Sequence, residues 1–117
     1  MLTGDEIREA LIAQLSTDER QHAVLYGASP NVPPGTLDFG PQKIDAPWPA
    51  CLGFIDREPA ANWGHSCRYV LLSIDSGEAM SFEARFPPFQ RNDNLAWRTI
   101  YQSPTAPDWA VKVPHHE

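Results

Sequence analysis

The sequence predicts an α+β fold, in which an N-terminal helix or helix pair packs on a small antiparallel β-meander sheet of three to five strands. Three observations support this class. Apolar residues recur at helical spacing over residues 3–15. Apolar or alternating runs of strand length follow after residue 50, and short segments rich in glycine, proline, serine and aspartate separate them.

Length and composition indicate one domain. The chain has 117 residues, of which 42% are hydrophobic and 21% are charged, as is typical of a single globular unit. We expect residues 1–117 to form a single domain with three parts. These are a helical part at 1–27, a wrap rich in proline and glycine at 28–49, and a β-rich part at 50–113.

The first helix is predicted over residues 3–15 by unusually complete start signals. Thr3 and Glu6 have the spacing of a capping box, in which each side chain accepts a hydrogen bond from the other residue's backbone amide. Leu2 and Ile7 occupy the two positions of a hydrophobic staple. Apolar residues then continue at helical spacing to Leu15.

A second short helix is expected to follow directly. Ser16 or Thr17 would cap its N-terminus, and the acidic residues that come next suit the positive end of a helix dipole. Val24 and Leu25 would supply its apolar surface, and Gly27 would end it.

The wrap at 28–49 shows little periodicity, and a short strand is expected only at the letters TLDF, residues 36–39. Long loops inside small domains are often functional. Two readings of its apolar side chains stay open: Phe39 and Trp48 cover one side of the core, or they contact a partner.

The β-rich part should form a meander. Residues 51–56 and 69–74 are nearly all apolar, which suits strands buried on both faces, while residues 79–86 alternate. Residues 95–102 alternate too and favour a strand over a helix, and the tail at 109–113 allows one more short strand.

The two strands on either side of the letters DSGE are expected to pair as a hairpin. A tight turn there places Leu71 opposite Phe82 and Tyr69 opposite Ala84. The apolar face of this hairpin, which includes Cys67, would then be covered by the helices.

Net charge restricts the partners. Fifteen acidic and nine basic residues give a formal charge of −6, which opposes binding to nucleic acid or to an anionic membrane. No secretory signal or membrane-spanning run is visible, and two cysteines fall far short of a disulfide scaffold. We therefore expect a cytoplasmic protein whose partner is another protein, with a basic surface; a homodimer stays open.

One reactive pairing stands out in the sequence. On a strand that begins near residue 63, His65 and Cys67 would share a face, with Asp56 or Asn62 available to orient the imidazole. This arrangement suits a thiol-dependent hydrolase or transferase. A metal site on the same pair is the other alternative, but further ligands at zinc spacing are missing, so neither metal nor cofactor is expected.

The function we favour from the sequence is a non-enzymatic protein-interaction module of the inhibitor, immunity or adaptor type. The sequence lacks a complete set of catalytic residues. Its amphipathic aromatic residues lie in or beside polar and proline-rich segments, which suits an interface. The predicted partner-binding residues are Phe39, Trp48, Asn62 and Trp63.

Overall fold

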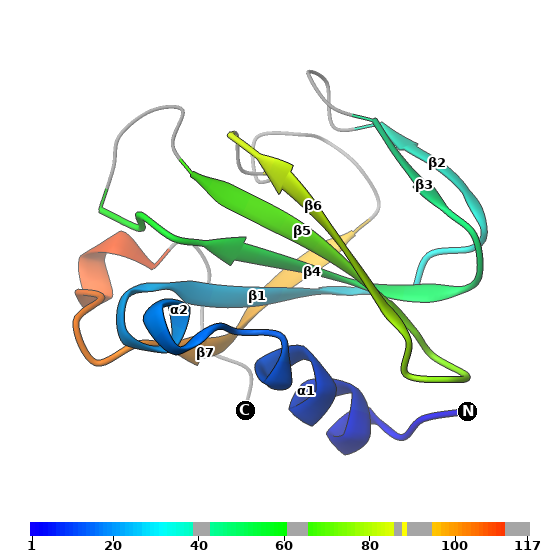
Figure 1. Ribbon diagram of the computed structural model, residues 1–117, viewed down its shortest axis with the longest axis horizontal. Helices are drawn as coiled ribbons and strands as arrows, with labels where there is room; N and C mark the ends of the chain where they lie inside the picture. Colours follow the sequence, from blue (N-terminus) through cyan, green and yellow to red (C-terminus); the bar gives the residue numbers. More distant parts are fainter. Residues whose placement is uncertain (39–42, 61–65, 86–87, 89–94, 112–117) are drawn as a thin grey trace.

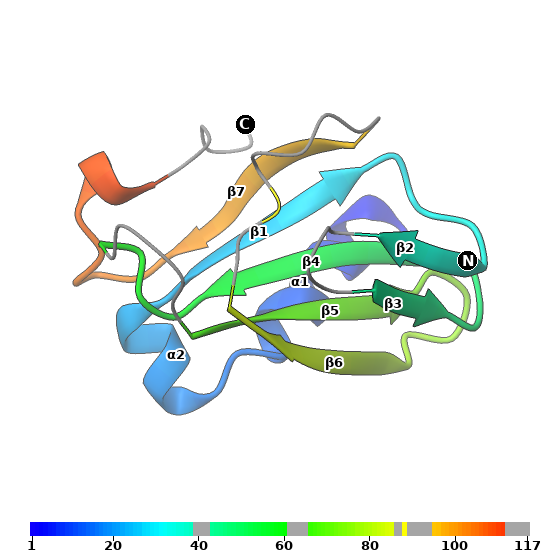
Figure 2. The same ribbon diagram turned by 90° about the horizontal axis from the view of Figure 1, so that it is seen from above.

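The computed structural model shows one antiparallel five-stranded sheet with helices on one face and a two-stranded hairpin on the other (Figures 1 and 2). The structure describes residues 1–38, 43–60, 66–85, 88 and 95–111. The α+β class predicted from the sequence is confirmed.

Both helices start with the capping chemistry that their sequences indicate. Helix α1 spans Gly4–Ala13, and the Thr3 hydroxyl accepts a hydrogen bond from the Glu6 amide at 3.1 Å. Helix α2 spans Thr17–His22, and the Ser16 hydroxyl accepts one from the Glu19 amide at 3.1 Å. In each case the glutamate completes the capping box, so two amides that a helix start leaves unpaired are satisfied locally.

The second helix is shorter than expected. Ala23 adopts an extended conformation and ends α2, and strand β1 (Val24–Ser29) begins at the next residue. Val24 and Leu25, which the sequence analysis assigned to α2, therefore lie in this strand and are fully buried on opposite faces of the sheet. Two adjacent apolar residues fit either period, and burial on both faces favoured the strand. Gly27 lies inside β1 and does not end a helix.

The other strands of the large sheet are β4 (Ala50–Asp56), β5 (Cys67–Ser73), β6 (Ala79–Ala84) and β7 (Ala96–Gln102). Their order is β6-β5-β4-β1-β7, with every neighbouring pair antiparallel. Strands β4 and β5 are buried along their whole length, as their apolar runs predicted. The strand preferred for residues 95–102 is also confirmed.

The β5–β6 hairpin has a register two residues away from the predicted one. Leu71 lies opposite Met80, and Tyr69 lies opposite Phe82, so the pair of Leu71 with Phe82 was wrong. Gly77 adopts φ 79°, a left-handed conformation that glycine tolerates, and its amide bonds the Ser73 carbonyl at 3.0 Å. Because strand side chains alternate with period two, this slip leaves every side chain on its expected face.

The helices cover the opposite face of the sheet from the one predicted. The face with Cys67, Tyr69 and Leu71 packs against the hairpin of β2 (Gly35–Asp38) and β3 (Lys43–Ala46), not against the helices. Strand β2 confirms the short strand expected in the wrap. The helices cover the opposite face, whose buried residues include Leu11, Leu15, Leu25, Cys51, Ile55, Val70, Leu72 and Ile100.

The segment after β7 forms a short 3-10 helix, η1 (Asp108–Ala110). The strand expected to begin at Trp109 was therefore wrong over the described residues. The amides of Ala110 and Val111 bond the carbonyls of Pro107 and Asp108, which closes a helical turn in place of strand pairing.

A β-bulge shapes the contact between α1 and the sheet. The β1–β7 register shifts between Leu25 and Tyr26, so Ile100 is an extra residue on β7. Ile100 and Tyr101 consequently both join the cluster on the helix face. Ile100 lies directly over Gly27, where an added Cβ would stand 2.4 Å from the Ile100 Cδ1 atom. Glycine at this position therefore allows the bulged side chain to lie flat on the sheet.

We predict that Gly27→Ala lowers the free energy of unfolding by about 1–3 kcal/mol, because the new methyl group overpacks this contact. Ile100→Val removes the Cδ1 atom, so the cost of Gly27→Ala should be smaller in that background. Urea denaturation of the four proteins of this double-mutant cycle measures both effects. Gly4→Ala is the control, since a Cβ at Gly4 meets nothing within 4 Å. An equal cost of Gly27→Ala in both backgrounds would contradict the proposed contact.

Candidate functional site

Two of the residues predicted for thiol chemistry, Cys67 and Asp56, are buried where the ends of β4 and β5 pair. Cys67 on β5 is opposite Asp56 on β4, and both are 0% exposed. Burial, reinforced by the nearby Asp56 carboxylate, raises the pKa of the Cys67 thiol to about 12. A nucleophilic cysteine needs the opposite shift. His65 and Asn62 lie outside the described residues, so their part in the pair stays a prediction.

The predicted partner-binding residues are described only in part. Trp48 is half-buried and packs against the cluster of residues beneath the β2–β3 hairpin. Part of the surface of the Trp48 ring is therefore buried against the core. Phe39, Asn62 and Trp63 lie outside the described residues.

The strongest electrostatic feature is an ion-pair network around Glu19, which is only 5% exposed. The Glu19 Oε1 atom accepts hydrogen bonds from the Ser16 amide at 2.9 Å and from Arg68 Nη2 at 2.8 Å. The Oε2 atom accepts from Arg57 Nε at 2.8 Å and from Arg68 Nε at 2.9 Å. These contacts hold the pKa of Glu19 down, at about 2, against the opposing effect of its burial.

The two arginines of this network use their other donors as well. Arg68 donates to the Gln14 carbonyl and to the Ser81 hydroxyl, each at 2.6 Å. Arg57 forms a two-point contact with the Glu83 carboxylate, at 2.6 and 2.9 Å. A hollow beside them is lined by Ser16, Asp18, Glu19, Arg57, Arg68 and Glu83. Because both cations are already matched by protein acceptors, this network ties α2 to the sheet and offers little to a ligand.

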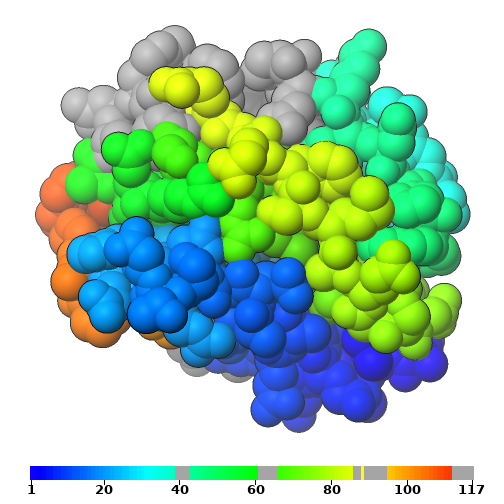
Figure 3. Space-filling view, viewed as in Figure 1, coloured from blue at the N-terminus to red at the C-terminus, as the bar shows by residue number. Residues whose placement is uncertain are grey.

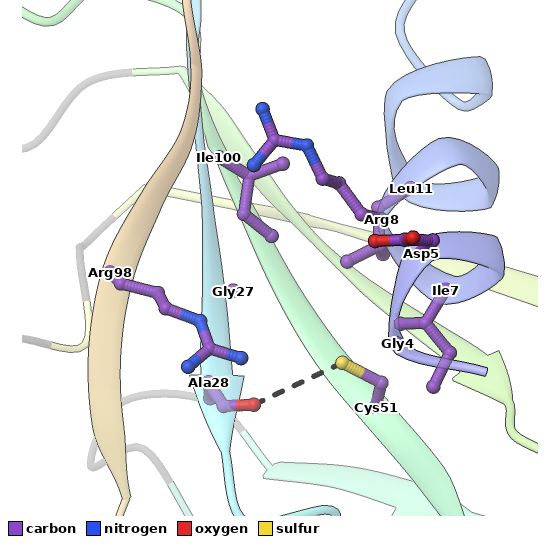
Figure 4. A pocket seen from close by; sticks show the side chains of 10 residues that line it. All are labelled: Gly4, Asp5, Ile7, Arg8, Leu11, Gly27, Ala28, Cys51, Arg98 and Ile100. Carbon is purple, nitrogen blue, oxygen red and sulfur yellow. Dashed lines mark hydrogen bonds between the residues drawn. The ribbon is translucent and has the colours of Figure 1, made fainter. Parts of the chain in front are cut away.

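A larger pocket opens on the helix face, between α1 and β7 (Figure 4). Its volume is about 430 Å³. Its lining residues are Gly4, Asp5, Ile7, Arg8, Leu11, Gly27, Ala28, Cys51, Arg98 and Ile100. Figure 4 shows Arg8 extending from the helix toward Ile100, Arg98 extending from the facing strand toward Ala28, and the Cys51 sulfur pointing from β4 toward the Ala28 carbonyl.

The thiol of Cys51 is part of this pocket but is poorly suited to act as a nucleophile. Its sulfur lies 3.9 Å from the Ala28 carbonyl oxygen. Burial raises its pKa to about 11, and the positive charge of Arg98 offsets only part of that rise. The thiol therefore stays protonated near neutral pH and contributes an apolar surface.

Sequence reasoning missed both assemblies. Glu19 and Arg68 are 49 residues apart along the chain, and the sequence analysis treated Glu19 only as an acidic residue at the positive end of a helix. Arg8 and Arg98 looked like ordinary solvated charges, because their proximity depends on how α1 crosses the sheet.

Two general features bear on the site. Within the described ranges, no group of three or more histidine, cysteine, aspartate or glutamate side chains could hold a metal ion. Of the helices in the described part of the chain, none has the length and apolarity needed to cross a membrane.

Comparison with known proteins found no match: no protein family, no curated protein and no solved structure is significantly similar to the chain. Its function is therefore inferred from its own geometry.

We predict that Glu19→Gln lowers the free energy of unfolding by roughly 3 kcal/mol, because it leaves two arginines beside a neutral side chain. Glutamine can still complete a capping box, so the substitution isolates the loss of charge. Glu6→Gln makes the same change in the exposed capping box of α1 and is the matched control. Chemical denaturation should show a far smaller effect for Glu6→Gln; equal effects would contradict the role of the network.

The same network predicts a pH dependence. The pKa of Glu19 is lowered from 4.5 in the reference state to about 2 in the folded protein. Its contribution to stability is therefore complete above about pH 4.5 and is lost as the pH falls toward 2. Thermal unfolding between pH 7 and pH 2.5 should show a smaller acid loss for Glu19→Gln than for the natural protein. Parallel curves would be inconsistent with this assignment.

We predict that both thiols resist iodoacetamide in the folded protein at neutral pH, since Cys51 and Cys67 are buried and have raised pKa values. Both should react rapidly in guanidinium chloride. Mass spectrometry of Cys51→Ser and Cys67→Ser identifies which thiol reacts. Fast labelling of Cys67 in the folded protein would instead support the thiol-enzyme hypothesis.

Proposed function

We propose that this protein is a cytoplasmic, non-enzymatic protein-interaction module whose partner carries a basic surface. The observation that carries the proposal is Trp109, whose side chain is 75% exposed although it belongs to a well-anchored segment. Exposed tryptophans held in place are frequent centres of protein interfaces.

The segment that presents Trp109 is fixed on both sides. Ala106 and Ala110 are buried at 6% and 1% exposure. The Gln102 side-chain amide donates to the Ala106 carbonyl at 2.9 Å and to the Asp108 carboxylate at 2.8 Å. The indole therefore projects from a pre-organised turn, which reduces the conformational entropy that binding would cost.

Acidic residues belong to both segments that meet at this end of the molecule. The segment before η1 packs on the end of α2, where the Thr105 hydroxyl donates to the Gln21 carbonyl at 2.5 Å. Figure 3 shows the two segments side by side, in orange and blue, at one end of the molecule. Asp108 belongs to η1, and Asp18, which is 90% exposed, lies on α2. Together with the net charge of −6, these carboxylates would steer a basic partner toward Trp109. We call residues 18–22 and 105–109 the Trp109 surface.

The burial of other candidate groups adds support. Cys67 and Asp56 are enclosed in the sheet, and the arginines around Glu19 are matched by acceptors. Neither assembly presents a reactive group to a substrate. The thiol-enzyme alternative gains no support from the described residues.

Trp109→Ala should weaken partner binding about 30-fold or more, as expected of a central interface tryptophan. It should leave the melting temperature nearly unchanged, because the ring is exposed. The measurement is cross-linking and affinity capture from native cells, followed by titration of the identified partner in increasing salt. The affinity for the partner should fall as the salt concentration rises and in the Asp18→Asn and Asp108→Asn variants. Both results would support a partner with a basic surface.

Two control variants locate the interface. Trp48→Ala should reduce stability, by less than the ~3–5 kcal/mol of a fully buried tryptophan. Trp63→Ala tests the region predicted from the sequence. Loss of capture with Trp63→Ala and full capture with Trp109→Ala would move the interface away from the Trp109 surface and overturn this part of the proposal.

A further inference from the structure

We propose that the pocket between α1 and β7 binds a small monocarboxylate with an apolar body, such as a medium-chain carboxylic acid. This site is separate from the Trp109 surface, and the proposal does not depend on protein binding. It rests on the size of the pocket, its apolar floor and the two arginines among its lining residues, one from α1 and one from β7.

The pocket exists because α1 covers only part of its side of the sheet. Leu11 packs closely on the centre of the sheet, where a Cβ on Gly53 would stand 3.0 Å from its Cδ2 atom. Toward β7, side chains of the helix and of the strands line the pocket instead (Figure 4). The volume of about 430 Å³ lies near the low end of the ~300–1,000 Å³ usual for small-molecule sites. A compact ligand therefore suits it better than a long lipid chain.

The floor of the pocket is apolar and rigid. It consists of the buried side chains of Leu11, Cys51 and Ile100, beside Gly27, which adds no side chain. Ile7 adds a further apolar wall from α1. A hydrocarbon body placed here would leave water on contact with surfaces already held by the core, and that transfer favours binding.

The polar groups of the pocket select a negative charge. Arg8 and Arg98 come from opposite walls, and neither forms an ion pair or hydrogen bond with another residue in the described part of the chain. They contrast with Arg57 and Arg68, whose donors are taken up by protein acceptors. A guanidinium group binds a carboxylate through two parallel hydrogen bonds.

The lining also argues for one negative charge over two. Asp5 is the only carboxylate among the lining residues, so the lining carries two positive charges and one negative charge. A monoanion would leave the occupied pocket with no net charge, whereas a phosphate dianion would leave an uncompensated negative charge beside Asp5. Such a positive spot is notable on a chain with a net charge of −6.

The experiment measures binding of octanoate to the full chain by calorimetry, with amide chemical shifts to locate the site. Octanol and octylamine test the need for a negative charge, acetate tests the need for an apolar body, and octyl phosphate tests the preference for a carboxylate. We expect octanoate to bind most tightly and to shift the amides of α1 and β7. The Arg8→Gln and Arg98→Gln variants should each bind octanoate at least about tenfold more weakly.

The control variant is Arg85→Gln, which removes the same charge from an exposed arginine outside the pocket. It should bind octanoate as the natural protein does. All three arginines are exposed, so these variants should fold, which their melting temperatures check. Absence of octanoate binding, equal binding of octanol, tighter binding of octyl phosphate, or an equal loss in Arg85→Gln would each overturn the proposal.

Discussion

The carboxylate of Glu19 completes the N-terminal cap of α2 and, at the same time, accepts hydrogen bonds from two arginines of the sheet region. Through Arg68 the same network reaches Gln14, which caps the C-terminus of α1, and Ser81 on β6. One buried charge is therefore connected by hydrogen bonds to both helices and to the sheet. The open space between α1 and β7 depends on where α1 lies, because a helix shifted toward β7 would fill it.

Features encoded by neighbouring residues could be predicted from the sequence. The capping box of Thr3 and Glu6 and the apolar runs of β4 and β5 are local patterns, and both were confirmed. The boundary between α2 and β1 was misplaced, because Val24 and Leu25 fit either period until the sheet buries both. The apolar run of β5 indicated that both of its faces are buried, but it could not show which layer covers each face.

The candidate sites depend on contacts between distant residues, and the sequence indicated few of them. Glu19 meets Arg68 only when α2 docks on β5, and Arg8 and Arg98 line one pocket only because α1 packs on the sheet beside β7. The bulge that brings Ile100 over Gly27 has no signal in the letters of β7. By contrast, Cys67 attracted attention because of its neighbours in sequence, while its chemistry is governed by burial between strands.

The place of β1 in the sheet has a consequence for folding during synthesis. Strand β1 is made first but lies between β4 and β7, and its outer edge pairs with residues as late as Gln102. Until β7 emerges from the ribosome, that edge of a largely apolar strand has open backbone donors and acceptors. Such an edge can pair with another nascent chain. The interval between the synthesis of β4 and that of β7 is therefore the period when this protein is most exposed to aggregation and most in need of a chaperone.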